Sequence, residues 1–186
     1  MQDISLHILD IIQNSIKAEA TAISIVLSAE DGFLNLMVKD NGIGMDQELL
    51  QKATDPFVTS RTTRRVGLGL PLLKDSAELA GGKLEIRSKP GEGTEVVASF
   101  RIDHIDRRPL GDLAETIISV VMSEPSIELE IELSSQKNTF VFNTAEIKNR
   151  LDGVSITELD IINWLKEYLK EGITETFGGV LDEVDS

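Results

Sequence analysis

The spacing of apolar residues changes abruptly within the first 40 positions of this chain, and this change constrains the fold more than any other feature. Isoleucines recur every three or four positions between residues 4 and 16, which predicts an α-helix over residues 3–18. Two strand-like runs follow, Ala22–Ser28 and Phe33–Val38, joined by the turn sequence Ala29-Glu-Asp-Gly32. A helix followed directly by a hairpin predicts helices that pack on a sheet.

The rest of the first 106 residues continues with helices and a second hairpin. A short helix is expected over residues 46–52 and a longer one over Leu68–Leu79, which ends at Gly81-Gly82. Lys83–Ser88 and Thr94–Ile102 form a hairpin pattern. Residues 54–67 have no clear period and are predicted to form a long loop, which inside a compact domain is usually functional or mobile.

The character of the sequence changes at Arg107-Arg-Pro109, which we interpret as a junction between residues 1–106 and a C-terminal α/β extension, residues 107–186. The extension either packs on the first region or builds a dimer interface. Its expected elements are, in order, a helix (Leu113–Met122), two strands (Ser126–Leu133 and Thr139–Phe142), an amphipathic helix (Thr157–Lys170) with Trp164 toward the core, and a frayed tail from Gly178 onward.

Composition narrows the classes of function. The chain has 18 basic and 32 acidic side chains, and its net charge of −14 repels phosphate backbones, so nucleic acid is not an expected partner. It has no cysteine, which excludes disulfides and thiolate metal sites. No apolar run approaches the roughly 20 residues that cross a bilayer, and no secretory pattern follows Met1. We therefore expect a cytoplasmic protein without a membrane span.

The first helix carries a polar stripe. Asp3, His7, Asp10, Asn14 and Lys17 fall within an arc of roughly 80° at helical spacing. The stripe is either a narrow solvent face or the lining of a slot against a sheet. In a slot, Asn14 offers a neutral oxygen to a hard cation, Lys17 a positive charge to phosphate, and Asp10 an acceptor for the proton of a water.

Two glycine-containing loops are further candidates. Asp40-Asn-Gly42-Ile-Gly44-Met45 follows a strand, where glycines allow close approach to a flat ligand and an aspartate can accept a hydrogen bond from an amine. Alternatively, this sequence forms only a turn and has no role in ligand binding. Gly67-Leu68-Gly69-Leu70 is expected at the start of a helix. Its backbone amide groups could bind an anion there, or the glycines could serve only to cap the helix and allow close packing. Neither the P-loop nor the Rossmann glycine pattern is present.

The order of these pieces is more specific than any one of them. Asp10-x-x-x-Asn14-Ser-x-Lys17 precedes Asp40-x-Gly42-x-Gly44, then Gly67-Leu-Gly69-Leu70, then Gly91-x-Gly93-Thr94. Residues 3–102 thereby resemble the GHKL (Bergerat-fold) ATP-binding superfamily, which includes DNA gyrase B subunits, heat-shock chaperone ATPases, sensor histidine kinases and mismatch-repair ATPases. The resemblance implies an α+β fold, a two-layer α/β sandwich with helices on one face of a mixed sheet, and it implies ATP and Mg²⁺ as ligands.

The resemblance assigns roles to residues on both sides of the expected nucleotide. Asn14 is similar to the asparagine that coordinates Mg²⁺, and Lys17 to a lysine near the phosphates. Asp40 resembles the aspartate that accepts the adenine amino hydrogen, and Thr94 the threonine that reaches adenine through water. The loop with Gly42, Gly44 and Met45 resembles the one beneath the base.

The helix start Gly67, Leu68, Gly69 and Leu70 resembles the hinge that wraps the phosphates. The segment with Phe57, Thr59 and Arg61 resembles the Pro-Phe-x-Thr-Thr-Lys lid of one group of histidine kinases, with arginine in place of the lysine. Arg61, Arg64 and Arg65 concentrate positive charge near the expected triphosphate, or they keep an exposed loop solvated.

Asp10 is the candidate catalytic residue. It stands where the gyrase and chaperone branch has a glutamate and where many histidine kinases have an asparagine. An aspartate is one methylene shorter than a glutamate, so we expect its reach to a hydrolytic water to be poor and any hydrolysis to be slow.

Three functions fit this sequence. The first is a histidine-kinase-like ATP-binding module that acts on a partner protein; Lys17 and the Pro56-Phe57 segment favour it. The second is a slow ATPase clamp that forms a homodimer on ATP, as in the gyrase and mismatch-repair branch. The third is a degenerate scaffold that only binds protein. The first two take ATP or ADP as ligand.

Overall fold

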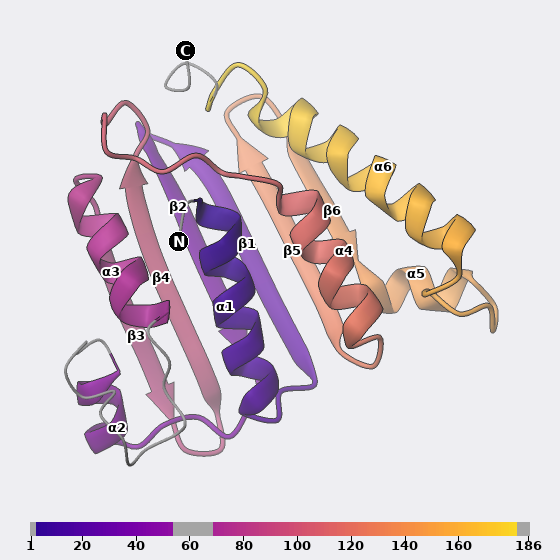
Figure 1. Ribbon diagram of the computed structural model, residues 1–186, viewed down its shortest axis with the longest axis horizontal. Helices are drawn as coiled ribbons and strands as arrows, with labels where there is room; N and C mark the ends of the chain where they lie inside the picture. Colours follow the sequence, from indigo (N-terminus) through magenta and orange to yellow (C-terminus); the bar gives the residue numbers. More distant parts are fainter. Residues whose placement is uncertain (1–2, 54–68, 182–186) are drawn as a thin grey trace.

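The computed structural model describes residues 3–53 and 69–181. These residues form one open six-stranded sheet with helices packed against it (Figure 1). The strands are β1 (Ala22–Glu30), β2 (Phe33–Asp40), β3 (Lys83–Lys89), β4 (Gly93–Arg101), β5 (Glu128–Ser135) and β6 (Thr139–Asn143). The helices are α1 (Ile4–Lys17), α2 (Gln47–Lys52), α3 (Gly69–Leu79), α4 (Leu113–Ser123), α5 (Thr144–Arg150) and α6 (Leu159–Phe177).

The strand order is β3-β4-β2-β1-β5-β6. All neighbours are antiparallel except β1 and β5, which run parallel with Ile25 opposite Ile131. Parallel neighbours need a crossover connection, and here the chain between them includes the β2–β4 region and α4. The residues after 106 therefore extend the sheet of the first region.

The four longer helices, α1, α3, α4 and α6, lie on one face of the sheet (Figure 1). Strand residues alternate accordingly: Ile23, Ile25 and Leu27 of β1 are buried under the helices, whereas Ser24 and Val26 between them are only half-buried. Each fully buried aliphatic side chain contributes about 1.5–3 kcal/mol of transfer free energy. The predicted two-layer α+β arrangement with a mixed sheet is confirmed.

The start of α1 is held from two sides. The Asp3 carboxylate caps the helix by accepting from the Leu6 amide at 3.0 Å and the Ser5 hydroxyl at 2.7 Å. The Ile4 and Ser5 amides donate to the carbonyls of Pro109 and Leu110, at 2.9 and 2.8 Å. The segment that leads to α4 therefore fixes the helix that carries the polar stripe.

The C-terminal helices differ from the sequence-based expectation. α6 runs to Phe177, beyond the predicted end at Lys170, and α5 was not predicted. The Asn143 side chain caps the start of α5 by accepting hydrogen bonds from the backbone amides of Ala145 and Glu146. Trp164 was expected in the core but is 56% exposed and stacks on Tyr168 with ring centroids 5.2 Å apart.

Within the expected tail, Val180 is partly buried and Leu181 is buried against the core, so the expected fraying does not hold for these two residues. Leu181 is 5% exposed, and its carbonyl accepts from Nη2 of the buried Arg107 at 3.1 Å. The same guanidinium donates to the Ile102 carbonyl at 2.9 Å. The predicted junction is therefore a packed crossing point of the chain. No helix in the described ranges is long and apolar enough to cross a membrane.

Candidate functional site

A cavity of about 370 Å³ opens between α1 and the sheet, where β2 ends and β4 begins. Its walls come from α1, from the loop after β2 and from β4, with one residue each from α2 and α3. The lining residues are Ile11, Asn14, Ser15, Lys17, Ala18, Asp40, Ile43, Gly44, Met45, Leu49, Leu70, Thr94 and Val96. Most of these are apolar, with a few polar groups among them, which is the usual make-up of a small-molecule site.

The Asp40 carboxylate is the buried acid of this cavity, at 8% exposure. Oδ2 accepts from the Ser15 hydroxyl at 2.7 Å, and Oδ1 accepts from the amides of Gly42 at 2.9 Å and Thr94 at 3.2 Å. A carboxylate has about four lone-pair sites, so these three donors from the described residues leave one. Asp40 is thereby held in a single orientation and keeps one acceptor position.

Two glycines allow the backbone segments around Asp40 to touch. Gly44 has a φ of +69°, and a Cβ there would lie 2.0 Å from the Lys89 carbonyl oxygen. Gly93 has a φ of +88°, and its Cβ would lie 2.0 Å from the carbonyl oxygen of Asp40. A side chain at either position would separate the loop after β2 from the β3–β4 turn, which together form the floor of the cavity.

A chain of hydroxyl contacts ties the loop to β3 and β4. The Met45 amide donates to Ser88 Oγ at 2.8 Å, and Ser88 Oγ lies 2.9 Å from Thr94 Oγ1 and from the Gly93 carbonyl oxygen. Ser88 is itself buried. These contacts fix Thr94 beside Asp40, whose carboxylate accepts from its amide.

Asp10 lies just outside the cavity, between α1 and the start of α3. Its Oδ2 accepts from Asn14 Nδ2 at 3.3 Å. A Cβ on Gly69, the first residue of α3, would collide with Oδ2 at 1.5 Å. Asp10 therefore needs a glycine at the start of α3, and a carboxylate there is favoured by the partial positive charge of a helix N-terminus.

His7 belongs to the same polar stripe but is buried in the helix layer at 2% exposure. Its Nδ1 has no hydrogen-bond partner among the described residues. Burial lowers the pKa of His7 below its ordinary value of 6.5, and the charges of Asp10 and Asp3 only partly oppose this effect. The stripe is therefore not a solvent face at this position.

The sequence-predicted residues fall into three groups. Seven line the cavity: Asn14, Lys17, Asp40, Gly44, Met45, Leu70 and Thr94. Three lie next to it without lining it: Asp10, Gly42 and Gly69. Five lie outside the described residues: Phe57, Thr59, Arg61, Gly67 and Leu68.

Sequence reasoning missed two serines that position the site. Ser15 bonds the Asp40 carboxylate, and Ser88 bonds Met45 and lies against Thr94. Both had a weak signal, because each is a polar residue at a position whose spacing predicts burial. Ser15 continues the apolar face of α1 after Ile8 and Ile11, and Ser88 continues the inward side of β3.

The side chains that line the cavity could hold a metal ion only if the ion takes most of its ligands from a bound molecule. Among residues 3–53 and 69–181, no three His, Cys, Asp or Glu side chains gather in a way that could hold a metal ion. Asn14 lines the cavity, and its amide nitrogen is taken by Asp10, which leaves its oxygen as the ligand atom. A single neutral oxygen fits Mg²⁺, which keeps waters and takes most of its ligands from substrate phosphates.

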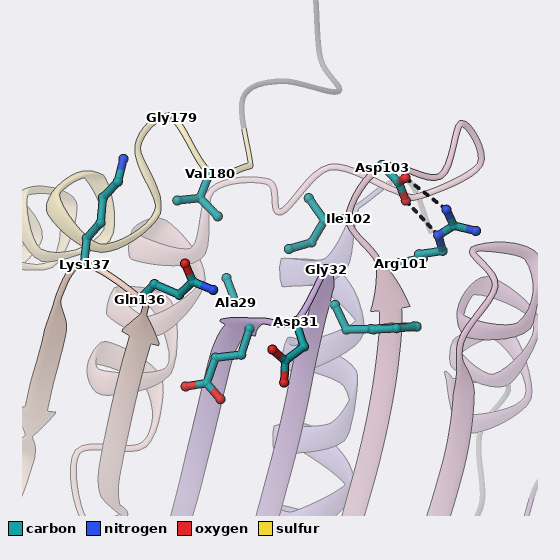
Figure 2. A pocket seen from close by; sticks show the side chains of 12 residues that line it. Ala29, Asp31, Gly32, Arg101, Ile102, Asp103, Gln136, Lys137, Gly179 and Val180 are labelled. Atoms are coloured by element: carbon teal, nitrogen blue, oxygen red, sulfur yellow. Dashed lines mark hydrogen bonds and ion pairs between the residues drawn. The ribbon is translucent and has the colours of Figure 1, made fainter.

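A second hollow, of about 600 Å³, lies at the other end of β2 (Figure 2). This hollow is larger than the cavity beside Asp40, but its charged side chains are exposed to solvent. Arg101 and Asp103 pair with each other at 2.8 Å and are mostly exposed, while Asp31 and Lys137 stand at the rim. Because none of these groups is buried and held in one orientation, the cavity beside Asp40 is the better candidate site.

Comparison with known proteins agrees with this geometry. Residues 2–104 match the family described as histidine kinase-, DNA gyrase B-, and HSP90-like ATPase. An uncharacterized sensor-like histidine kinase of Rhizobium meliloti is 39% identical over 103 residues, which cover 52% of this chain and 20% of that protein. The non-motile and phage-resistance protein of Caulobacter vibrioides is 37% identical over 112 residues, which cover 54% of this chain and 13% of that protein. The chain thus spans a fifth or less of these relatives.

Among solved structures, the N-terminal domain of a DNA repair protein has the same fold. The TM-score is 0.56 at 16% identity, over 76% of this chain and 52% of the other. The match therefore includes part of the region after residue 106. Since the family match covers more than half of the 186 residues, the chain belongs to the histidine kinase-, DNA gyrase B- and HSP90-like ATPase family.

Proposed function

We propose that the cavity beside Asp40 binds Mg-ATP and that the chain is a histidine-kinase-like ATP-binding module that acts on a partner protein. The family supports ATP as ligand, and the sensor kinases among its relatives favour the kinase-like branch. Stand-alone action and the partner are parts of the proposal, because the relatives are several times longer than this chain.

The adenine lies in the apolar part of the cavity. The remaining lone pair of Asp40 accepts the hydrogen of the exocyclic amine, which distinguishes adenine from guanine. Ile11, Met45 and Val96 provide apolar contacts for the ring. Thr94 is close enough to Asp40 to share a bridging water with the base.

The phosphates point toward the α1 side of the cavity. Lys17 supplies a positive charge there, and the oxygen of Asn14 binds the Mg²⁺ that the phosphates carry. A Mg²⁺ held there would supply neutralisation of phosphate charge and polarisation of the terminal phosphoryl group. Asp10 stands behind Asn14 and is the group available to accept a proton from an attacking water or hydroxyl.

The fixed Asp40 carboxylate carries this proposal, and calorimetric titration with Mg-ATP tests it. We expect Asp40→Ala to weaken binding about 100-fold or more, because a buried charge-assisted hydrogen bond is lost and three protein donors lose their acceptor. Asp40→Asn keeps the shape of the side chain and serves to separate lost recognition from misfolding. Asp103→Ala, an exposed acid at the other hollow, is the matched control and should leave the affinity within about twofold. Equal affinities of wild type and Asp40→Ala would contradict the adenine contact.

The fate of the terminal phosphate tests the kinase-like part. The full chain is incubated with γ-labelled Mg-ATP, and free phosphate and protein-bound label are counted over hours. We expect retention of ATP with little release of phosphate, because Asp10 is short and is held by Asn14. Fast release that Asp10→Asn abolishes would instead place the chain with the ATPases of the family, and ATP-dependent doubling of mass in light scattering would favour the clamp.

A further inference from the structure

The face of the sheet opposite the four longer helices has an apolar row across its middle. In strand register, Val26 of β1 lies opposite Met37 of β2, and Met37 lies opposite Val97 of β4. All three are half-buried although no described helix covers this face. We call this surface the open face. Apolar side chains adjacent on three neighbouring strands are unusual on the solvent side of a sheet.

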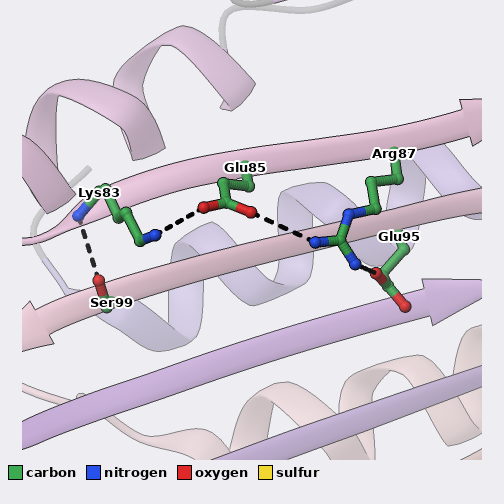
Figure 3. Close-up of polar contacts among 5 residues, drawn as sticks. All are labelled: Lys83, Glu85, Arg87, Glu95 and Ser99. Carbon is green, nitrogen blue, oxygen red and sulfur yellow. Dashed lines mark hydrogen bonds and ion pairs between the residues drawn. The ribbon is translucent and has the colours of Figure 1, made fainter.

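The row ends at an acidic side chain on each side, but the two sides differ. On the β4 side it ends at Glu85 of β3, which belongs to a closed set of ion pairs (Figure 3). Lys83 lies 2.6 Å from Glu85, Glu85 lies 3.4 Å from Arg87, and Arg87 lies 3.3 Å from Glu95. Two cations and two anions cancel, so this side of the open face has no charge left to attract a partner.

On the β5 side the charges are not cancelled. Glu128, Glu130 and Glu132 occupy alternate positions of β5 and are all exposed on the open face. None of the three forms an ion pair with a described residue. Alternate residues of a strand are about 6.6–6.8 Å apart, within the Debye length of about 8 Å at physiological salt, so the three carboxylates repel one another.

The cation nearest in register does not relieve this repulsion. Lys39 of β2 lies opposite Ser24 of β1, and Ser24 lies opposite Glu130. Two strand spacings, about 9–10 Å, separate the backbones of Lys39 and Glu130, and Lys39 forms no ion pair with a described residue. A hollow of about 270 Å³ lies between these residues, bounded also by Glu92 and Glu128. It has room for the end of one long cationic side chain.

We propose that the open face binds a basic, partly apolar segment of a partner protein. Apolar side chains of the segment cover Val26, Met37 and Val97, and its lysines or arginines lie over the β5 glutamates. A second copy of this chain does not fit, because it would bring a net charge of −14 toward the acidic column. Nucleic acid is disfavoured for the same reason. This proposal does not rest on nucleotide binding, because the apolar row and the β5 glutamates lie on the face of the sheet away from the four longer helices, although Asp40 borders both the 270 Å³ hollow and the candidate nucleotide cavity.

A synthetic 12-residue peptide in which lysine alternates with threonine and valine is the probe. It is titrated into the full chain without nucleotide, at low and at physiological salt. We expect the triple variant Glu128→Gln/Glu130→Gln/Glu132→Gln to bind it about tenfold more weakly than wild type, since three charge pairs of modest strength are lost. The matched control removes three exposed glutamates from the helix side, Glu158→Gln/Glu171→Gln/Glu175→Gln, and should change the affinity less than twofold.

A variant of the apolar row separates docking from plain charge attraction. Met37→Ser leaves every charge in place and should weaken peptide binding about threefold or more. Unfolding midpoints of all variants show whether the fold is kept. Equal losses in the two triple variants, no effect of Met37→Ser, or no binding by the wild-type chain would each overturn the proposal.

Discussion

The two ends of β2 carry hollows that differ in the way their polar groups are held. At the Asp40 end, one buried carboxylate accepts from Ser15, Gly42 and Thr94, which come from three separate segments. At the other end, Arg101 and Asp103 pair with each other in solvent. The second hollow has the larger volume, about 600 against 370 Å³. The comparison teaches that converging, desolvated groups indicate a site better than volume does.

We expect the largest effect from substituting one glycine at each hollow and comparing the losses in stability. Gly44 and Gly32 both have positive φ, at +69° and +79°, but only Gly44 faces backbone, the Lys89 carbonyl oxygen. We expect Gly44→Ala to lower the free energy of unfolding by about 3 kcal/mol or more, because strain and a backbone collision add. Gly32→Ala meets nothing within 4 Å and should cost about 1–2 kcal/mol. Urea denaturation measures both; equal losses would mean that the close approach at Gly44 does not hold.

Removing a serine hydroxyl near each of the two hollows should change the free energy of unfolding by an intermediate amount. Ser15→Ala removes the donor to the buried Asp40 Oδ2 and should lower stability by about 1–2 kcal/mol, because one carboxylate oxygen then loses its protein partner. The matched change is Ser135→Ala in the β5–β6 hairpin, whose hydroxyl accepts from exposed amides of Lys137 and Asn138. It should change the unfolding free energy by less than about 0.5 kcal/mol. A Ser135 effect as large as that of Ser15 would refute the contrast in burial.

The smallest effect concerns pH and extends the comparison to His7, a buried histidine whose Nδ1 has no hydrogen-bond partner within residues 3–53 and 69–181. The folded protein lowers the pKa of His7 below 6.5, so the unfolded chain binds more protons as the pH falls through 6.5. Stability that is present above pH 6.5 is therefore lost below it, with a slope of at most about 1.4 kcal/mol per pH unit from this group.

Denaturation of wild type and His7→Gln between pH 5 and 8 measures this term. The variant has no titrating group at position 7, so its stability should fall less steeply below pH 6.5 than that of wild type. Parallel curves would show that His7 titrates alike in the folded and unfolded states. The control variant is His104→Gln, which removes the other histidine, a partly exposed side chain beside Asp106, and is measured over the same pH range.

Much of the fold follows from local pattern. The isoleucine spacing predicted a helix over residues 3–18, and α1 spans Ile4–Lys17. The helix predicted to begin near Leu68 is α3, which starts at Gly69 in the described part of the chain. Elements with weaker local signals were missed, such as α5, whose start depends on the Asn143 cap. Trp164 sits at helical spacing with core residues, yet it is exposed and stacks on Tyr168.

The sequence by itself determined the order of the elements apart from α5, the family, and Asp40, Asn14 and Lys17 as candidate site residues, because apolar period and motif spacing are properties of neighbouring residues. Only the tertiary structure decided that Thr94 donates to Asp40 across 54 positions and that Ser15 holds the second oxygen. It also decided that β5 lies parallel to β1, which places the glutamates on the open face. These pairings depend on packing between distant segments, on which local spacing carries no information.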